Sequence, residues 1–158
     1  MLRITKQSDY GIVLMTLFAG AEAGRVHSTR DLAAGAKLPL PTVSKILKAL
    51  ARAGLLQSHR GVKGGYRIAR APAAISVEEI IRALEGPIAL TECIDERSEC
   101  EIEGTCPVRT NWQRINGAVK SALAAIPLSE MAAHVHLARP AWNGKPKAEA
   151  PGGTKVEA

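Results

Sequence analysis

The chain has 158 residues, and its 21 Lys and Arg against 15 Asp and Glu give a net charge of +6. The longest apolar stretch, residues 12–23, is too short and too mixed to cross a bilayer. The first ten residues lack the apolar core of a secretory signal, and an odd number of cysteines, three, fits a closed set of disulfides poorly. We therefore expect a soluble, cytoplasmic protein that does not enter a membrane.

Charge is distributed unevenly along the chain. Residues 1–75 carry twelve basic and three acidic side chains, residues 76–137 carry five and ten, and residues 138–158 carry four and two. A basic amino-terminal part indicates a polyanionic partner, most commonly nucleic acid, although a merely solvated basic surface has the same composition. The positions of the basic residues on the predicted helices have to separate these two interpretations.

Apolar residues at three- and four-residue steps predict three helices in the first part of the chain. The first runs from about residue 5 to residue 22. A capping box at residues 28–31 begins a short second helix, and a third helix has Pro41 in its first turn and stops at Gly54. Two short helices joined by a tight turn are typical of a helix-turn-helix.

The third helix has two contrasting faces. Its apolar face consists of Val43, Ile46, Leu47 and Leu50, and its polar face consists of Thr42, Ser44, Lys45, Lys48 and Arg52. Hydroxyl groups at the start of such a helix can bond base edges or phosphates, and the cations supply positive charge along the groove. The pattern predicts that this polar face binds double-stranded DNA.

Two short β-strands are predicted after the third helix, at residues 55–59 and 66–69. The turn between them, RGVKGG, is basic and rich in glycine. Glycine lets the backbone approach the sugar-phosphate chain, and Arg60 or Lys63 can enter a minor groove. The sequence therefore predicts a mainly α fold with a small β wing, in which residues 1–75 form a winged helix-turn-helix.

Residues 76–137 are predicted to contain a helix, a loop with cysteines and a long helix. A capping box at residues 76–79 begins the first of these, which we expect to pack beneath the wing. The long helix starts at Pro107 and keeps one apolar face for about five turns: Val108, Trp112, Ile115, Val119, Leu123 and Ile126. This stripe predicts a dimerisation helix, although a helix packed within one subunit has the same pattern. Residues 138–158 are predicted to be a disordered tail.

All three cysteines, Cys93, Cys100 and Cys106, lie in one short acidic loop. Thiolates bind zinc, copper(I) and iron-sulfur iron, so three of them supply most of a ligand set and leave one position open. Unliganded structural cysteines usually have apolar rather than acidic neighbours. Structural zinc prefers paired CxxC spacing, whereas the gaps here are six and five residues. An iron-sulfur electron carrier would need four cysteines at short spacings, which leaves a sensor as the favoured interpretation.

Together these segments resemble the IscR and NsrR group of dimeric winged-helix regulators that carry iron-sulfur clusters. The motifs are LRITKQSDYG, RDLA, LPTVSKILKALARAGLL, RGVKGGYRIA, SVEEIIRALEG and the three-cysteine loop, over residues 1–133. Within the group, TECIDERSECEIEGTCPVRTNWQRIN is most similar to regulators of the SUF iron-sulfur assembly operon. The resemblance implies a non-enzymatic, homodimeric repressor of assembly genes that binds an operator and a [2Fe-2S] or [4Fe-4S] cluster.

The resemblance also implies that the three cysteines bind cluster iron, and it leaves the fourth ligand open. IscR-like members have a histidine three residues after the third cysteine, where this chain has Arg109, which stays protonated and cannot be a ligand. NsrR-like members use an aspartate from the other subunit, and Asp9 occupies the matching place. Glu92 and Asp95 are alternatives, and Asp9 also suits a simpler role as a helix-end charge.

An alternative signal for the same fold is nitric oxide or a redox change. Iron held by a carboxylate is displaced more readily than iron held by a thiolate, so an aspartate ligand suits either signal. In both cases, a ligand on the first helix would connect the state of the cluster with the placement of the DNA-binding half.

Overall fold

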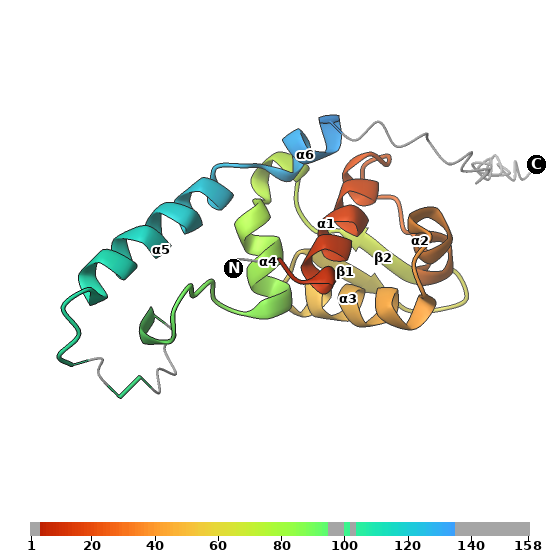
Figure 1. The fold of residues 1–158 in the computed structure, drawn as a ribbon. Helices are drawn as coiled ribbons and strands as arrows, with labels where there is room; N and C mark the ends of the chain where they lie inside the picture. The colour runs from red at the N-terminus through yellow and green to blue at the C-terminus, as the bar shows by residue number, and fades with distance from the viewer. Residues whose placement is uncertain (1–3, 95–99, 102–103, 135–158) are drawn as a thin grey trace, which may run out of the picture.

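The computed structural model describes residues 4–94, 100–101 and 104–134, and the predicted tail at 138–158 lies outside them. The elements are α1 (Lys6–Ala19), α2 (Thr29–Ala36), α3 (Leu40–Arg52), β1 (Leu56–His59), β2 (Gly65–Ile68), α4 (Val77–Glu85), α5 (Arg109–Ala124) and α6 (Leu128–His134) (Figure 1). Two single turns of 3-10 helix, η1 (Pro72–Ala74) and η2 (Glu92–Ile94), precede α4 and follow it. The mainly α fold with one antiparallel hairpin confirms the predicted fold class.

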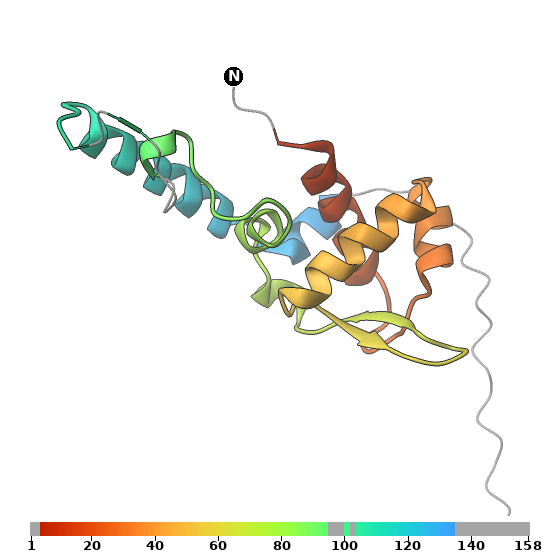
Figure 2. The same cartoon turned by 90° about the horizontal axis from the view of Figure 1, so that it is seen from below.

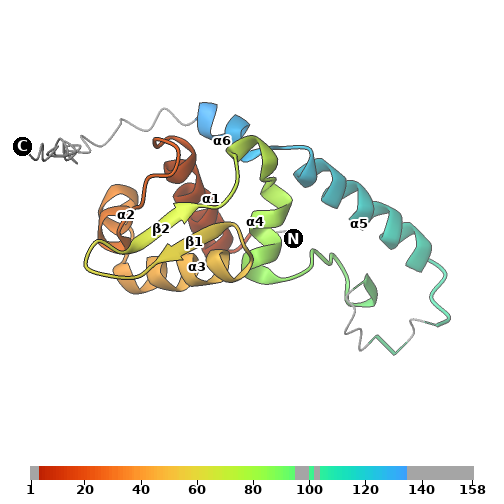
Figure 3. The same ribbon diagram turned by 180° about the vertical axis from the view of Figure 1, so that it is seen from behind.

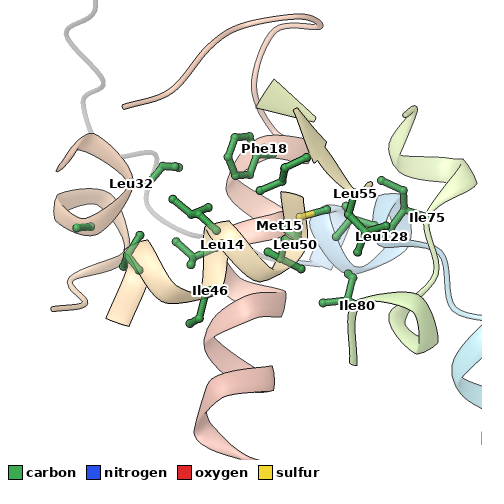
Figure 4. Close-up of a cluster of buried hydrophobic side chains, with 14 residues drawn as sticks. Leu14, Met15, Phe18, Leu32, Ile46, Leu50, Leu55, Ile75, Ile80 and Leu128 are labelled. Atoms are coloured by element: carbon green, nitrogen blue, oxygen red, sulfur yellow. The ribbon is translucent and has the colours of Figure 1, made fainter. Parts of the chain in front are cut away.

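The hydrophobic core lies where α1, α2, α3, α4, the start of β1 and the first residue of α6 meet (Figure 4). The predicted apolar face of α3 is completely buried, since Val43, Ile46, Leu47 and Leu50 are each 0% exposed. Leu14, Met15 and Phe18 of α1 and Leu32 of α2 pack into the same cluster. Burial of four such side chains fixes the rotation of α3 about its axis, because any turn would expose them to water.

Polar side chains begin three of the helices. Thr5 accepts a hydrogen bond from Ser8 N at 3.3 Å, and Ser28 accepts one from Asp31 N at 3.1 Å. At α4, Ser76 and Glu79 bond each other's backbone N–H groups, which forms the complete capping box that the sequence predicts. Each cap satisfies an N–H group that has no partner within its own helix.

The wing is attached to the segment that precedes α2. His27 N donates to Tyr66 O at 2.8 Å, and Tyr66 N donates to His27 O at 2.9 Å, so the backbone at residue 27 adds to the hairpin. Gly65 permits this approach because a Cβ there would meet the His27 carbonyl. The buried His27 ring packs edge-on against Phe18, with ring centroids 5.3 Å apart, and burial together with nearby Arg25 lowers its pKa. The base of the wing is therefore held against α1.

Helix α4 packs mainly against α1 and α3, and not beneath the wing as the sequence suggested. Its buried residues are Val77, Ile80 and Ile81. Gly11 of α1 faces Leu84 of α4, and a Cβ at Gly11 would meet Leu84 Cδ1. The expectation was wrong because the apolar pattern of α4 shows that one face is buried but does not name the element that covers it.

The long helix is shorter than predicted, and a helix that the sequence did not predict follows it. α5 starts at Arg109 instead of Pro107 and ends at Ala124, before Ile126. The next segment returns to the body of the molecule, where Leu128 N donates to Ile75 O at 2.8 Å and Val77 N donates to Ile126 O at 3.0 Å. Leu128 is 0% exposed, so α6 belongs to the core. α5 consequently projects from a body that α6 helps to close (Figures 1 and 3).

Candidate DNA-binding surface and cysteine loop

The polar face of α3 lies on the surface of the molecule. Lys45, Lys48 and Arg52 are exposed, and Thr42 and Ser44 are partly exposed. The tight turn between α2 and α3 uses Lys37 in the left-handed conformation, with φ of 54°. Since the opposite face of α3 is buried, these five side chains have a fixed direction, as a helix that reads a DNA groove requires.

The hairpin lies beside α3 and adds two basic residues at its tip (Figure 2). Arg60 and Lys63 are both exposed. The tip turn depends on glycine, because Gly61 has φ of +111° and a Cβ at Gly64 would meet backbone atoms of His59, Arg60 and Gly61. Contacts between these two basic residues and DNA remain predictions, and the geometry supplies a narrow, exposed tip that suits them.

The cysteine loop leaves the end of α4 and returns to the start of α5 (Figure 1). Cys93 lies in η2, Cys106 lies three residues before the first residue of α5, and none of the three cysteines is in a disulfide. All three are partly exposed. Within the described residues, no three His, Cys, Asp or Glu side chains lie close enough together to hold a metal ion. The three thiols therefore lie in one loop and, among the residues that the structure describes, do not form such a group.

The start of the cysteine loop is hydrogen-bonded to α5. Asn116 Nδ2 donates to Ile88 O at 3.0 Å, and Leu90 N donates to Asn116 Oδ1 at 3.2 Å. Further along, the Thr91 hydroxyl lies 3.3 Å from Cys93 Sγ. Asn116 is not among the residues predicted for the site, although an amide four residues after Trp112, within the apolar stripe of α5, is a signal for it.

The end of α4 is hydrogen-bonded to the start of α1. Thr5 Oγ1 donates to Glu85 Oε1 at 2.7 Å, and Gln7 Nε2 donates to Leu84 O at 3.1 Å. Burial raises the pKa of the Glu85 carboxyl, but the nearby Ser8 hydroxyl and the hydrogen bond from Thr5 lower it by more, so this pKa lies below its ordinary value. The residues just before the cysteine loop are thus tied to the first turn of α1.

The candidate fourth ligands lie on different elements. Asp9 is exposed in the first turn of α1, the same turn that bonds the end of α4. Glu92 is exposed in η2, and Asp95 lies outside the described residues. Arg109, which cannot be a ligand, is the first residue of α5. Asp9 is thus accessible to a second subunit, and its assignment as a ligand stays a prediction.

Comparisons with known proteins agree on one family of regulators. Residues 4–134 match the model of the Rrf2 family, described as iron-dependent transcriptional regulators. The regulator CymR of Bacillus subtilis is 30% identical over 84% of this chain and 91% of its own length. The regulator NsrR of Shouchella clausii is 26% identical over 78% of this chain and 76% of its own length.

Solved structures of two such proteins have the same fold. The structure of CymR, described as the global cysteine regulator of B. subtilis, superposes with a TM-score of 0.66 and 32% identity, covering 84% of this chain and 98% of that one. The structure of T. potens IscR gives a TM-score of 0.63 and 27% identity, covering 82% of this chain and 85% of that one. No helix in the described part of the chain is long and apolar enough to cross a membrane.

The polar face of α3 yields a direct test. Replacing Lys48 or Arg52 with Gln should weaken binding to every DNA sequence and reduce the slope of log affinity against log salt by about 1, because each contact with a phosphate releases counterions. The matched control is Lys120→Gln on α5, remote from α3 (Figure 1), which should change neither quantity. Fluorescence anisotropy over a salt series measures both, and an unchanged slope in the α3 variants would remove their phosphate role.

Proposed function

Because the chain belongs to the Rrf2 family of transcriptional regulators, we propose that it represses iron-sulfur assembly genes according to a cluster held by its cysteine loop. Its relatives are regulators and not enzymes, and the polar face of α3 together with the wing suits operator DNA. One observation carries the sensing part: the loop with all three cysteines starts at a helix end that is hydrogen-bonded to α1 of the DNA-binding half.

The donor set fits an iron-sulfur cluster in its chemistry. Cys93, Cys100 and Cys106 supply three thiols, the ligands that such clusters use, and all are partly exposed and outside disulfides. The thiols do not converge in the described structure of one chain. Binding groups that are distant until the metal arrives are common, because metal binding often supplies the free energy that orders its own site. When bound, the cluster supplies iron atoms that hold the three sulfurs at fixed separations.

A homodimer would supply the missing ligand. Val108, Trp112 and Ile115, on α5 and just before it, are 46%, 37% and 46% exposed, although they are large and apolar. Exposed apolar residues on one projecting helix favour association with a second copy, since a symmetric contact buries the same patch on both chains. Asp9 of the partner subunit then serves as the fourth ligand, and its exposed position at the start of α1 leaves it accessible to a second chain.

The chain's own contacts provide a route from the cysteine loop to DNA. Movement of Cys93 is passed to residues 84–90, which are bonded to Asn116 on one side and to Thr5 and Gln7 on the other. Movement of α1 shifts α3, because the two helices share the core. A dimer binds two half-sites only when its recognition helices are about 34 Å apart or a multiple of that distance. A small change in their separation therefore alters operator affinity.

The likeness to CymR favours a second candidate function, a regulator of cysteine metabolism that acts without a cluster. In that case the three thiols would not need to bind a common metal group. The two candidates differ in whether bound iron and sulfide change operator affinity, and one assay separates them.

That assay compares operator binding by the anaerobically isolated protein before and after removal of its iron and sulfide. The proposal expects the two forms to differ in operator affinity by about tenfold or more, a coupling typical of regulators. The variant Cys93→Ser should bind operator as the cluster-free form does under both conditions. Equal affinities for the two wild-type forms would refute cluster sensing and favour the cysteine-metabolism alternative. A change at stoichiometric nitric oxide would instead identify that gas as the signal.

The fourth ligand has its own test. Asp9→Ala should lower the iron retained per chain after anaerobic desalting, because one ligand to the cluster is lost. The matched control is Asp31→Ala, which removes an exposed carboxylate from the first turn of another helix, α2. The control should keep the wild-type iron content and visible spectrum. Wild-type iron content in Asp9→Ala would leave the fourth position to Glu92, Asp95 or an external ligand.

A further inference from the structure

Asn116 differs from every other residue of α5 in its burial. Within this helix, all of which lies in the described part of the chain, it alone is buried, with 3% of its surface exposed. The rest of α5 is exposed or partly exposed, so packing of this helix within its own chain centres on an amide instead of on an apolar side chain. A buried amide is unfavourable unless its donor and acceptor are both satisfied, which makes its partners informative.

Both ends of the Asn116 amide bond the same short backbone segment. Its nitrogen donates to Ile88 O at 3.0 Å, and its oxygen accepts from Leu90 N at 3.2 Å. The two bonds join Asn116 to backbone groups two residues apart, a carbonyl at residue 88 and an N–H at residue 90. Residues 88–90 have no partner strand in the described structure, since its one sheet contains only β1 and β2. A side chain therefore replaces the pairing that fixes this segment.

We call these two hydrogen bonds between Asn116 and residues 88–90 the clamp. Its position at the start of the cysteine loop indicates what it does. Leu90 comes three residues before Cys93, while α5, which carries Asn116, begins three residues after Cys106. Asn116 itself lies in the middle of α5, ten residues after Cys106, so the clamp ties the chain just before Cys93 to the helix that follows Cys106. The Thr91 hydroxyl lies 3.3 Å from Cys93 Sγ, so the residue next to the clamp also contacts the sulfur.

We infer that Asn116 is a positioning residue that fixes the chain before Cys93 against α5 and so holds Cys93 beside that helix for ligand binding. It touches neither sulfur nor metal, and it acts through the backbone of residues 88–90. The inference rests on the proposed function only for the identity of the group that the thiols bind. The clamp itself exists in the chain without any ligand, so it can be measured independently.

The decisive variant is Asn116→Leu, which has a similar volume and lacks both hydrogen bonds. In the cluster-free protein, amide hydrogen exchange at Leu90 should accelerate at least tenfold, because its acceptor is gone. Alkylation of Cys93 by iodoacetamide should change at least threefold relative to alkylation of Cys106 in the same molecule. The matched control, Asn111→Leu, replaces an exposed asparagine on the same helix and should leave both rates within twofold of wild type.

A second variant distinguishes a local change at the clamp from general unfolding. Asn116→Asp keeps an oxygen that accepts from Leu90 N, loses the donation to Ile88 O and places a carboxylate oxygen against that carbonyl. Its Leu90 amide should exchange more slowly than in Asn116→Leu, while Cys93 alkylation still departs from wild type. A general loss of structure would instead accelerate exchange in α1 and α3 as well, and that result would refute a local positioning role.

Cluster retention provides the readout that depends on the proposed function. The visible absorption of reconstituted Asn116→Leu should be lost to a chelator at least tenfold faster than that of wild type or Asn111→Leu. Wild-type exchange at Leu90 together with wild-type retention would overturn the inference. If wild-type protein bound no iron, the proposed function would fail, and the exchange and alkylation rates would still decide the role of Asn116.

Discussion

The close contact between α1 and α4 determines where the cysteine loop can begin. Gly11 lets the two helices approach until Leu84 fills the space where a Cβ would lie, and Thr5 and Gln7 bond the last turn of α4. Because α1 also contributes Leu14 and Met15 to the core that orients α3, its position is fixed by both apolar and polar contacts. Whatever displaces the end of α4 therefore acts on the helix that supports the DNA-binding surface.

Two kinds of interaction stabilise different parts of this chain. The DNA-binding half is held by burial of apolar side chains, which is strong and tolerates little rearrangement. The cysteine loop is held at its base by a few hydrogen bonds, from Thr5 and Gln7 on one side and Asn116 on the other. Individual hydrogen bonds contribute about 1 kcal/mol to stability, so such a junction can rearrange at small cost. That contrast suits a rigid DNA-binding half joined to a cysteine loop whose position can change.

The sequence predicted the elements more successfully than their partners. The face of α3, the capping box of α4 and the glycine turn of the wing follow from local rules of period and backbone geometry, and all three are present. The place of α4 and the existence of α6 were missed because they depend on contacts between residues distant in the chain, such as Leu128 with Ile75. For the site, the thiols were found by residue type, whereas Asn116 acts through backbone groups, and only its place as an amide in an apolar stripe marks it in the sequence.

The central claim is that the state of the cysteine loop reaches DNA through the bonds between α1 and α4. The most direct measurement is the ratio of operator affinities with and without cluster in a Gln7→Leu, Glu85→Ala double variant, which removes both bonds and leaves the Thr5 cap intact. The account predicts wild-type iron content, unchanged non-specific DNA binding and a ratio close to one. A wild-type ratio in this variant would show that the signal takes another route and would contradict the account.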